Sequence, residues 1–237
     1  MCIFFKMLGR ISSAAVLGVT ILSTAHASIL TFDFTPRLAG NAQIPQGYGD
    51  NVTATTMGTF GYFQGNGFTP NITISYQTLL ANGSVKFGHV LFWDSTYSSL
   101  VDFAIANAAD DGTGNGDIGY AEITFTPSGG QYVTINSFQI ASYDPLGTQT
   151  SQVIRVLNQF GTVVWDGSSD ITAGSVRHFS PGIGDYGPLR LQFGNSWFVG
   201  IDNVNFDESG APIPEPGSLA LYTAGLALLA CHCRRRS

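Results

Sequence analysis

The chain of 237 residues carries a formal net charge of −6, and 44% of its residues are hydrophobic. Between positions 28 and 208 there are fifteen acidic and only five basic residues, a net charge near −10. This balance argues against nucleic acid as a partner, because phosphate contacts require several Lys or Arg side chains. The three cysteines, Cys2, Cys231 and Cys233, lie near the termini, which excludes a disulfide framework or a thiolate metal site in the central region.

Residues 1–27 have the three parts of a secretory signal peptide. Lys6 and Arg10 supply the positively charged part, and Ile11–Leu22 is an apolar stretch rich in Ala, Val, Leu and Ile. Ala25-His26-Ala27 forms the A-x-A cleavage site that follows, so the mature chain is expected to begin at Ser28. We therefore expect a signal-peptide helix that signal peptidase removes during export. An uncleaved membrane anchor is the alternative.

The central region, residues 28–210, has the sequence patterns of β-strands. In Ser28–Thr35, for example, Leu30, Phe32 and Phe34 alternate with their neighbours at a period of two. Later strands combine such alternation with β-branched residues and are separated by turn residues. The expected strands are Ser28–Thr35, Val52–Phe63, Asn71–Leu79, Phe87–Asp94, Val101–Ala106, Ala121–Thr126, Tyr132–Ala141, Gln152–Leu157, Thr162–Trp165, Leu189–Gly194 and Trp197–Phe206.

The segments between these strands have the composition of turns and loops. Asn158-Gln159-Phe160-Gly161 is typical of a hairpin turn, in which Gly161 suits a position with positive φ. Asp110–Asp117 is a glycine-rich loop, and Arg177 and His178 are expected in a polar loop. No helical stripe occurs away from the termini. The sequence therefore predicts an all-β fold, an antiparallel β-sandwich or jelly roll, flanked by two terminal helices.

Residues 121–206 resemble the second half of galactose-binding-like jelly rolls. The similarity lies in the strand order, in the segments EITF, INSFQI and LRLQFG, and above all in IDNV-x-F at Ile201–Phe206. It implies a fold that carries many unrelated functions. It also implies that Asp202 helps to bind a structural calcium ion. The alternative is that Asp202 and Asn203 form a short polar pair at a strand turn.

Residues 211–237 combine a proline-rich spacer, an apolar segment and an arginine cluster. Pro214-Glu215-Pro216 is extended, since proline fixes φ and lacks a backbone donor. The apolar segment, residues 218–233, is expected to be helical but is short for a membrane span, which needs roughly 20 residues. The arginines that follow, as expected of a cytoplasmic flank, are Arg234, Arg235 and Arg236. A helix of the core is the alternative.

This order of parts resembles the C-terminal sorting tail of PEP-CTERM proteins. The resemblance is carried by Pro214, Glu215 and Pro216, the short hydrophobic span and the terminal arginine cluster. It implies temporary anchoring in the inner membrane, processing by an exosortase near the proline motif, and then a location at the cell surface or outside the cell. It further implies a role connected with extracellular polysaccharide or a biofilm matrix.

A second candidate calcium site lies at the glycine-rich loop. Asp111, Asn115, Asp117 and Glu122 follow the spacing of an EF-hand loop, which Thr113 interrupts at the third ligand position. Calcium takes six to eight oxygen ligands, and these side chains could supply several. However, a strand pattern follows the loop where an EF-hand has a helix. The alternative is that these side chains satisfy local backbone donors. No other cofactor is expected.

Aromatic side chains could form a platform that stacks on sugar rings. The candidates for it are Tyr62, Phe63, Tyr76, Trp93, Tyr97, Tyr143, Trp165, Tyr186 and Trp197. Most aromatic residues of a β-sandwich belong to its core, and Trp165 is expected there. Tyr143 and Tyr186 lie beside Asp and near Gly or Pro, so we expect them at loop tips, as ligand-binding residues.

The central region has no recognisable catalytic motif. Its two histidines, His89 and His178, lack a second ligand at zinc-binding spacing, and there is no nucleophile elbow or phosphate loop. The leading interpretation is a non-catalytic component of the cell surface or biofilm. A lectin-like carbohydrate-binding module is the first alternative. A polysaccharide-active hydrolase is the second alternative. Carboxylates are plentiful, but no motif pairs two of them, so the sequence neither locates nor excludes a catalytic pair.

Overall fold

The computed structural model describes residues 27–34, 36–53, 67–107, 119–143, 152–168, 175–194 and 196–209. Within these ranges the chain forms strands and no helix, so none of them contains a helix that is long and apolar enough to cross a membrane. The sorting tail and most of the signal peptide lie outside the described residues. The predictions made for those segments are therefore not tested by the fold.

The strands form two antiparallel sheets. The first sheet consists of β1 (Ser28–Leu30), β4 (Leu91–Tyr97), β5 (Leu100–Ile105), β7 (Tyr132–Ser142), β10 (Val176–Phe179), β11 (Ile183–Asp185) and β13 (Val199–Ser209). Its strands follow the order β10-β7-β13-β5-β4, while β1 also pairs with β13 and β11 with β7. We call it the seven-stranded sheet.

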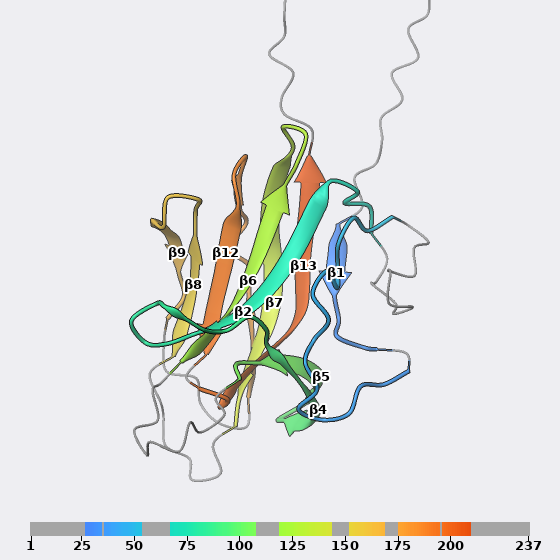
Figure 1. The fold of residues 1–237 in the computed structure, drawn as a ribbon, viewed down its shortest axis with the longest axis vertical. Helices are drawn as coiled ribbons and strands as arrows, with labels where there is room; N and C mark the ends of the chain where they lie inside the picture. Colours follow the sequence, from blue (N-terminus) through green and yellow to red (C-terminus); the bar gives the residue numbers. More distant parts are fainter. Residues whose placement is uncertain are drawn as a thin grey trace, which may run out of the picture.

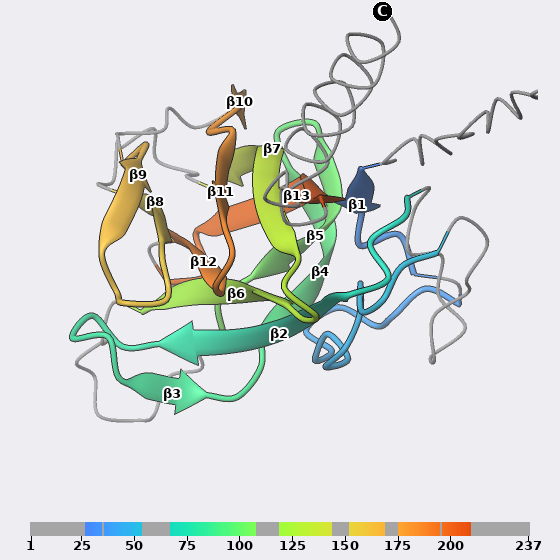
Figure 2. The ribbon, with the colours of Figure 1, turned by 90° about the horizontal axis from the view of Figure 1, so that it is seen from above.

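The second sheet has six strands. They are β2 (Ile72–Leu79), β3 (Val85–Phe87), β6 (Tyr120–Pro127), β8 (Val153–Leu157), β9 (Val163–Asp166) and β12 (Leu189–Gly194). Their order is β3-β2-β6-β12-β8-β9. The two sheets face each other as layers, which confirms the predicted all-β sandwich (Figures 1 and 2).

The main hydrophobic core lies between the two sheets. Alternate residues of β2, Ile72, Ile74 and Tyr76, are buried in it, while Thr73 and Ser75 between them are exposed. This is the period of two that the sequence pattern predicts. From opposite layers, the rings of Phe125 on β6 and Phe206 on β13 meet with centroids 5.1 Å apart.

An irregular segment closes one edge of the core. Tyr48 is fully buried there; its hydroxyl accepts a hydrogen bond of 2.9 Å from the amide of Phe32, and its carbonyl accepts one of 2.7 Å from the Tyr76 hydroxyl. Burial raises the pKa of Tyr48 to about 12. The predicted strand 28–35 ends at Leu30, because Phe32 takes a φ of 55° and turns the chain while its ring stays in the core.

Other strand predictions need correction. The expected strand Phe87–Asp94 is two strands in different sheets, β3 and β4, and the chain between them crosses from one layer to the other. Val52 makes only an isolated bridge with Thr69, and residues 54–63 lie outside the described ranges. The polar loop expected at Arg177 and His178 is wrong, since both belong to β10.

The hairpin prediction is confirmed. Gly161 has a φ of 79° and its amide donates to the carbonyl of Asn158, while the Asn158 amide donates to the carbonyl of Thr162. Trp165 beyond the turn is half-buried against the core, where its ring meets those of Phe138 and Phe179.

Candidate functional site

A partly open pocket of about 380 Å³ lies at the β4–β5 side of the seven-stranded sheet. Its lining is apolar and aromatic with two amide side chains, and consists of Asn41, Leu91, Trp93, Ile105, Ala106, Asn107 and Trp197. We call it the aromatic pocket. A concave, mostly apolar site with a few polar groups is the usual form of a small-ligand site.

Four residues of the pocket lining, Leu91, Trp93, Ile105 and Trp197, belong to a hydrophobic cluster outside the main core, while Ala106 belongs to the main core itself. Along β5, Ala104 belongs to the main core, whereas Phe103 and Ile105 belong to a second hydrophobic cluster together with Tyr97. Successive side chains of a strand point to opposite faces, so this second cluster covers the outer face. A substantial apolar layer therefore exists outside the sandwich.

Four aromatic rings form a closed cycle beside the pocket. Their centroids are 6.1 Å apart for Trp93–Tyr97, 5.2 Å for Tyr97–Tyr143, 5.3 Å for Tyr143–Trp197 and 6.3 Å for Trp197–Trp93. Each ring thus contacts two others at distances typical of favourable aromatic pairs. We call these four residues the aromatic cluster. Trp93 and Trp197 line the pocket itself, and Tyr143 remains 38% exposed beside it.

Hydrogen bonds hold the cluster in place. The Tyr97 hydroxyl donates to the carbonyl of Trp197 at 2.8 Å, and the amide of Tyr143 donates to the carbonyl of Phe198 at 2.8 Å. Burial raises the pKa of Tyr97, so its hydroxyl stays a proton donor at any physiological pH. The strand β4 and the chain before β13 are thereby fixed to each other.

Gly200 allows the close approach of two strands under the cluster. A Cβ atom at this position would lie 2.2 Å from the ring of Phe103. No real side chain tolerates such a distance, so any larger residue would displace the ring. The glycine therefore lets Phe103 lie directly on β13 and support the Tyr97 ring, whose centroid is 4.5 Å away.

Three residues of the pocket lining carry polar groups, namely the side-chain amides of Asn41 and Asn107 and the indole N–H of Trp93. The Asn107 side-chain nitrogen lies 2.8 Å from Nε2 of His89, and burial lowers the pKa of His89, so the neutral ring can accept this hydrogen bond. The indole N–H of Trp93 is buried and has no hydrogen-bond partner in the described part of the chain. An unsatisfied buried donor costs about 1–3 kcal/mol.

The two tyrosines predicted as ligand-binding residues lie far apart. Tyr143 follows the last residue of β7, and Tyr186 is 48% exposed at the other end of that strand, where its ring meets Tyr132 at 4.8 Å. A strand of this length spans roughly 30–35 Å, so they cannot share one platform. The structure instead joins Tyr143 to three other residues of the candidate list, Trp93, Tyr97 and Trp197.

No sequence signal distinguishes these three from core aromatics. Trp93 directly follows two other apolar residues of β4, Tyr97 ends that strand, and Trp197 stands in a short turn. Asn41 and Asn107 are ordinary loop and strand-end residues in the sequence. Only the pairing of β4, β5 and β13 brings them together.

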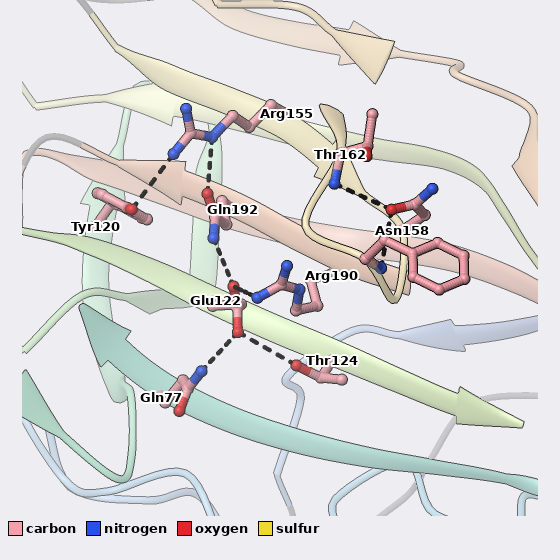
Figure 3. A network of polar contacts seen from close by, with 10 residues as sticks. Gln77, Tyr120, Glu122, Thr124, Arg155, Asn158, Thr162, Arg190 and Gln192 are labelled. Carbon is pink, nitrogen blue, oxygen red and sulfur yellow. Dashed lines mark hydrogen bonds and ion pairs between the residues drawn. The ribbon is translucent and has the colours of Figure 1, made fainter. Parts of the chain in front are cut away.

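Among the candidate calcium ligands, Glu122 lies on β6 within a row of polar side chains that crosses the six-stranded sheet (Figure 3). Its carboxylate is fully buried and accepts hydrogen bonds from the side-chain amides of Gln77 at 2.6 Å and Gln192 at 2.5 Å. Arg155 in turn donates to the side-chain oxygen of Gln192 at 2.7 Å and to the Tyr120 hydroxyl at 3.3 Å. Register pairing places Gln77 opposite Glu122, Glu122 opposite Gln192, and Gln192 opposite Arg155.

The other loop candidates, Asp111, Asn115 and Asp117, lie outside the described residues, so the calcium site at this loop stays a prediction.

The row of polar side chains across the six-stranded sheet contains two carboxylates, whose separation can be compared with that of a glycosidase pair. Asp166 is its last carboxylate, three strands from Glu122 and hence roughly 14 Å away. This exceeds the separation of the two carboxylates in glycoside hydrolases, about 5–9.5 Å.

Asp202, the second calcium candidate, is buried on β13. Its carboxylate accepts hydrogen bonds from the backbone amide of Asn203 at 2.6 Å and from the Asn203 side chain at 2.9 Å. Burial, and then the charges of Asp33 and Asp102, raise the pKa of Asp202 to about 8. Within the described ranges, no three His, Cys, Asp or Glu residues are arranged to hold a metal ion. Calcium at Asp202 therefore stays a prediction.

Ala27 and Ser28 of the expected signal cleavage site belong to the described residues. Ser28 is the first residue of β1 and is buried, with its hydroxyl 2.8 Å from that of Thr69. Ala27 precedes it, while Ala25 lies outside the described residues. The motif residues Pro214, Glu215 and Pro216 and the arginine cluster lie outside them as well.

Comparisons with known proteins give limited similarity. No protein-family model and no curated protein matches the chain. The chain is similar to the enzymatically active domain of tailspike protein 4 of bacteriophage CBA120, with 18% identity over 59% of this chain and 19% of that one and a TM-score of 0.27. It is also similar to a family 35 carbohydrate binding module from Clostridium thermocellum, with 14% identity over 58% of this chain and 99% of that one and a TM-score of 0.26. Neither similarity is close enough to bear on the function of this chain.

Proposed function

We propose that this protein is an exported, non-catalytic component of the cell surface or extracellular matrix, and that its β-sandwich binds carbohydrate in the aromatic pocket. The observation that carries the proposal is the cycle of four aromatic rings, two of which line a pocket of about 380 Å³. Indole rings present flat apolar faces, which suit the C–H face of a sugar ring.

The polar groups of the pocket fit the same ligand class. Asn41 and Asn107 bring neutral amides to the pocket lining. Sugar hydroxyl and ring oxygens are acceptors for such donors. The pocket lining has no charged side chain, and the region from position 28 to 208 has a net charge near −10. Neutral glycans are therefore favoured over anionic ones.

A binding experiment tests this proposal. The purified full chain and its Trp93→Ala variant are applied to an array of neutral and anionic glycans, and positive ligands are titrated by calorimetry. Phe160→Ala is the matched control, since Phe160 is 81% exposed at the β8–β9 turn, on the other sheet. We expect binding that Trp93→Ala abolishes and Phe160→Ala preserves. The absence of any glycan signal from the wild-type protein would refute the proposal.

The export route is proposed from the sequence termini. The signal peptide supports secretion through signal peptidase, and Pro214-Glu215-Pro216 with the arginine cluster supports a transient hold in the inner membrane followed by exosortase processing. Mass spectrometry of the protein recovered from its producing cells tests the route. We expect a mature chain that begins at Ser28 and ends near the proline motif. A mature surface form that still carries Arg236 would contradict the sorting proposal.

A further inference from the structure

A second pocket, of about 310 Å³, lies on the same seven-stranded sheet between β10, β7, β13 and β1. Its lining is mainly neutral and polar, with the side chains of Ser137, Gln139, His178, Ser180 and Asn205 among its members. None of its lining residues lines the aromatic pocket. We call it the polar pocket.

The register of the strands shows that both pockets open on one face. Val176 pairs with Ala141, Ala141 with Gly200, Gly200 with Ile105, and Ile105 with Leu91, so a single row crosses the sheet from β10 to β4. Four of these residues belong to the hydrophobic cluster of the outer face. Two of them, Ile105 and Leu91, line the aromatic pocket.

The polar pocket begins at the next row of the same face. Gln139 and His178 pair with each other. Gln139 lies two residues before Ala141 on β7, and His178 lies two residues after Val176 on β10. Residues two apart on a strand point to the same side, about 6.6 Å further along. Ser137 lies two residues before Gln139 on β7 and pairs with Asn205 on β13. The outer face therefore changes, over two short steps, from an apolar row to hydroxyl, amide and imidazole groups and the carboxyl group of Asp202, which pairs with Gln139.

We infer that the two pockets are subsites of one groove, and that the ligand is an extended neutral polysaccharide chain rather than a single sugar. The aromatic pocket stacks on one sugar unit, and the amides and hydroxyls of the polar pocket bind hydroxyl groups of units further along the chain. The two sites are separated by two interstrand spacings and one step along the strands, roughly 12 Å. A chain of several sugar units spans this distance, and one unit does not.

This inference rests on the proposed function and adds to it a dependence on chain length. The probes are neutral homopolysaccharides of glucose, mannose, galactose and xylose, each with its fragments of one to six units, titrated into the purified full chain. We expect affinity to increase with fragment length until both pockets are occupied. Occupation of the polar pocket is expected to lower the Kd about tenfold, which is equivalent to one or two hydrogen bonds.

Two variants localise the effect. His178→Ala with Ser180→Ala removes two exposed polar side chains of the pocket, and is expected to abolish the gain for long fragments while short fragments bind as before. His178→Trp fills the pocket with a bulky ring and should weaken only the long fragments. Ser75→Ala, an exposed residue of the other sheet, is the control. Thermal melting checks that each variant is folded.

The possible outcomes are distinct. If no probe binds the wild-type chain, the proposed function fails, and this inference fails with it. If a probe binds with an affinity that is independent of length, or if both pocket variants keep the full length dependence, carbohydrate binding stands and the two-subsite groove is wrong. Length dependence that the variants remove supports the groove.

Discussion

The hydroxyl of Tyr97 donates a hydrogen bond of 2.8 Å to the backbone carbonyl of Trp197, 100 residues later in the chain. Tyr97 ends β4, and Trp197 precedes β13, so the bond joins two strands that are separated by β5 in the sheet. Trp197 lines the aromatic pocket, and the position of its ring depends on this backbone segment. The bond therefore links the stability of the sandwich to the geometry of the proposed sugar site.

Tyr97→Phe removes this hydrogen bond and keeps the aromatic ring. We expect the free energy of unfolding to fall by about 1–2 kcal/mol, because the Trp197 carbonyl loses its buried partner. We also expect weaker glycan binding, since the Trp197 segment is no longer fixed. Urea denaturation and calorimetry measure the two effects. Tyr132→Phe, at the far end of β7, is the control; an equal loss of affinity in that variant would argue against a positioning role for Tyr97.

Glu122→Ala is expected to destabilise the protein by about 3 kcal/mol. The substitution leaves the amide donors of Gln77 and Gln192 without the carboxylate that accepts both, and bonds to charged groups contribute about 1.5–3 kcal/mol each. Urea denaturation measures the change. Ser75→Ala, an exposed site on the neighbouring strand, should change stability by less than about 0.5 kcal/mol. A change for Glu122→Ala as small as this control would mean that the polar row contributes little.

Asp202 should make stability depend on pH in an unusual direction. Its pKa in the folded protein is about 8, above the value near 4 of an unfolded aspartate. Between these values the native state holds a proton that the unfolded state has lost. The free energy of unfolding therefore falls as the pH rises through this window, by up to about 1.4 kcal/mol per unit, and levels off above pH 8.

Asp202→Asn tests this dependence because the amide is a neutral analogue of the protonated carboxyl group. We expect the variant to be more stable than wild type near pH 8 and similar to it near pH 4. Thermal melts across this range give the answer, with Asp207→Asn on the same strand as the control. A pH profile that Asp202→Asn leaves unchanged would show that Asp202 ionises normally in the folded state.

Calcium binding is tested by metal removal and return. If either predicted site is occupied, calcium at a hundredfold excess over its Kd should raise Tm by roughly 5–10 °C above the value in EDTA. Asp117→Asn abolishes this shift if the glycine-rich loop binds the ion, and Asp202→Asn abolishes it if β13 does. A Tm that calcium does not change would remove both sites.

Alternation in the sequence predicts the long central strands well. In β2, β6 and β12 each second side chain belongs to the core between the sheets, as the pattern predicts, although Glu122 and Gln192 on the other face of β6 and β12 are buried as well. It fails where a strand depends on its partner. Arg177 and His178 form a strand because β7 offers hydrogen bonds to them, although their own side chains are polar and exposed. The alternating pattern predicts a strand that continues through Phe32, but the backbone turns there with a positive φ.

The sequence alone determines the all-β class, the absence of cysteine from the central region and its acidic charge, since these follow from composition and local periodicity. It also contains the features on which the proposed export route rests, because targeting signals are linear. The candidate site is decided only by the tertiary structure. Trp93, Tyr97, Tyr143 and Trp197 come from β4, the end of β7 and the turn before β13, and antiparallel pairing brings them together. Pairing over such distances in the chain depends on which strands become neighbours, and no local pattern specifies that choice.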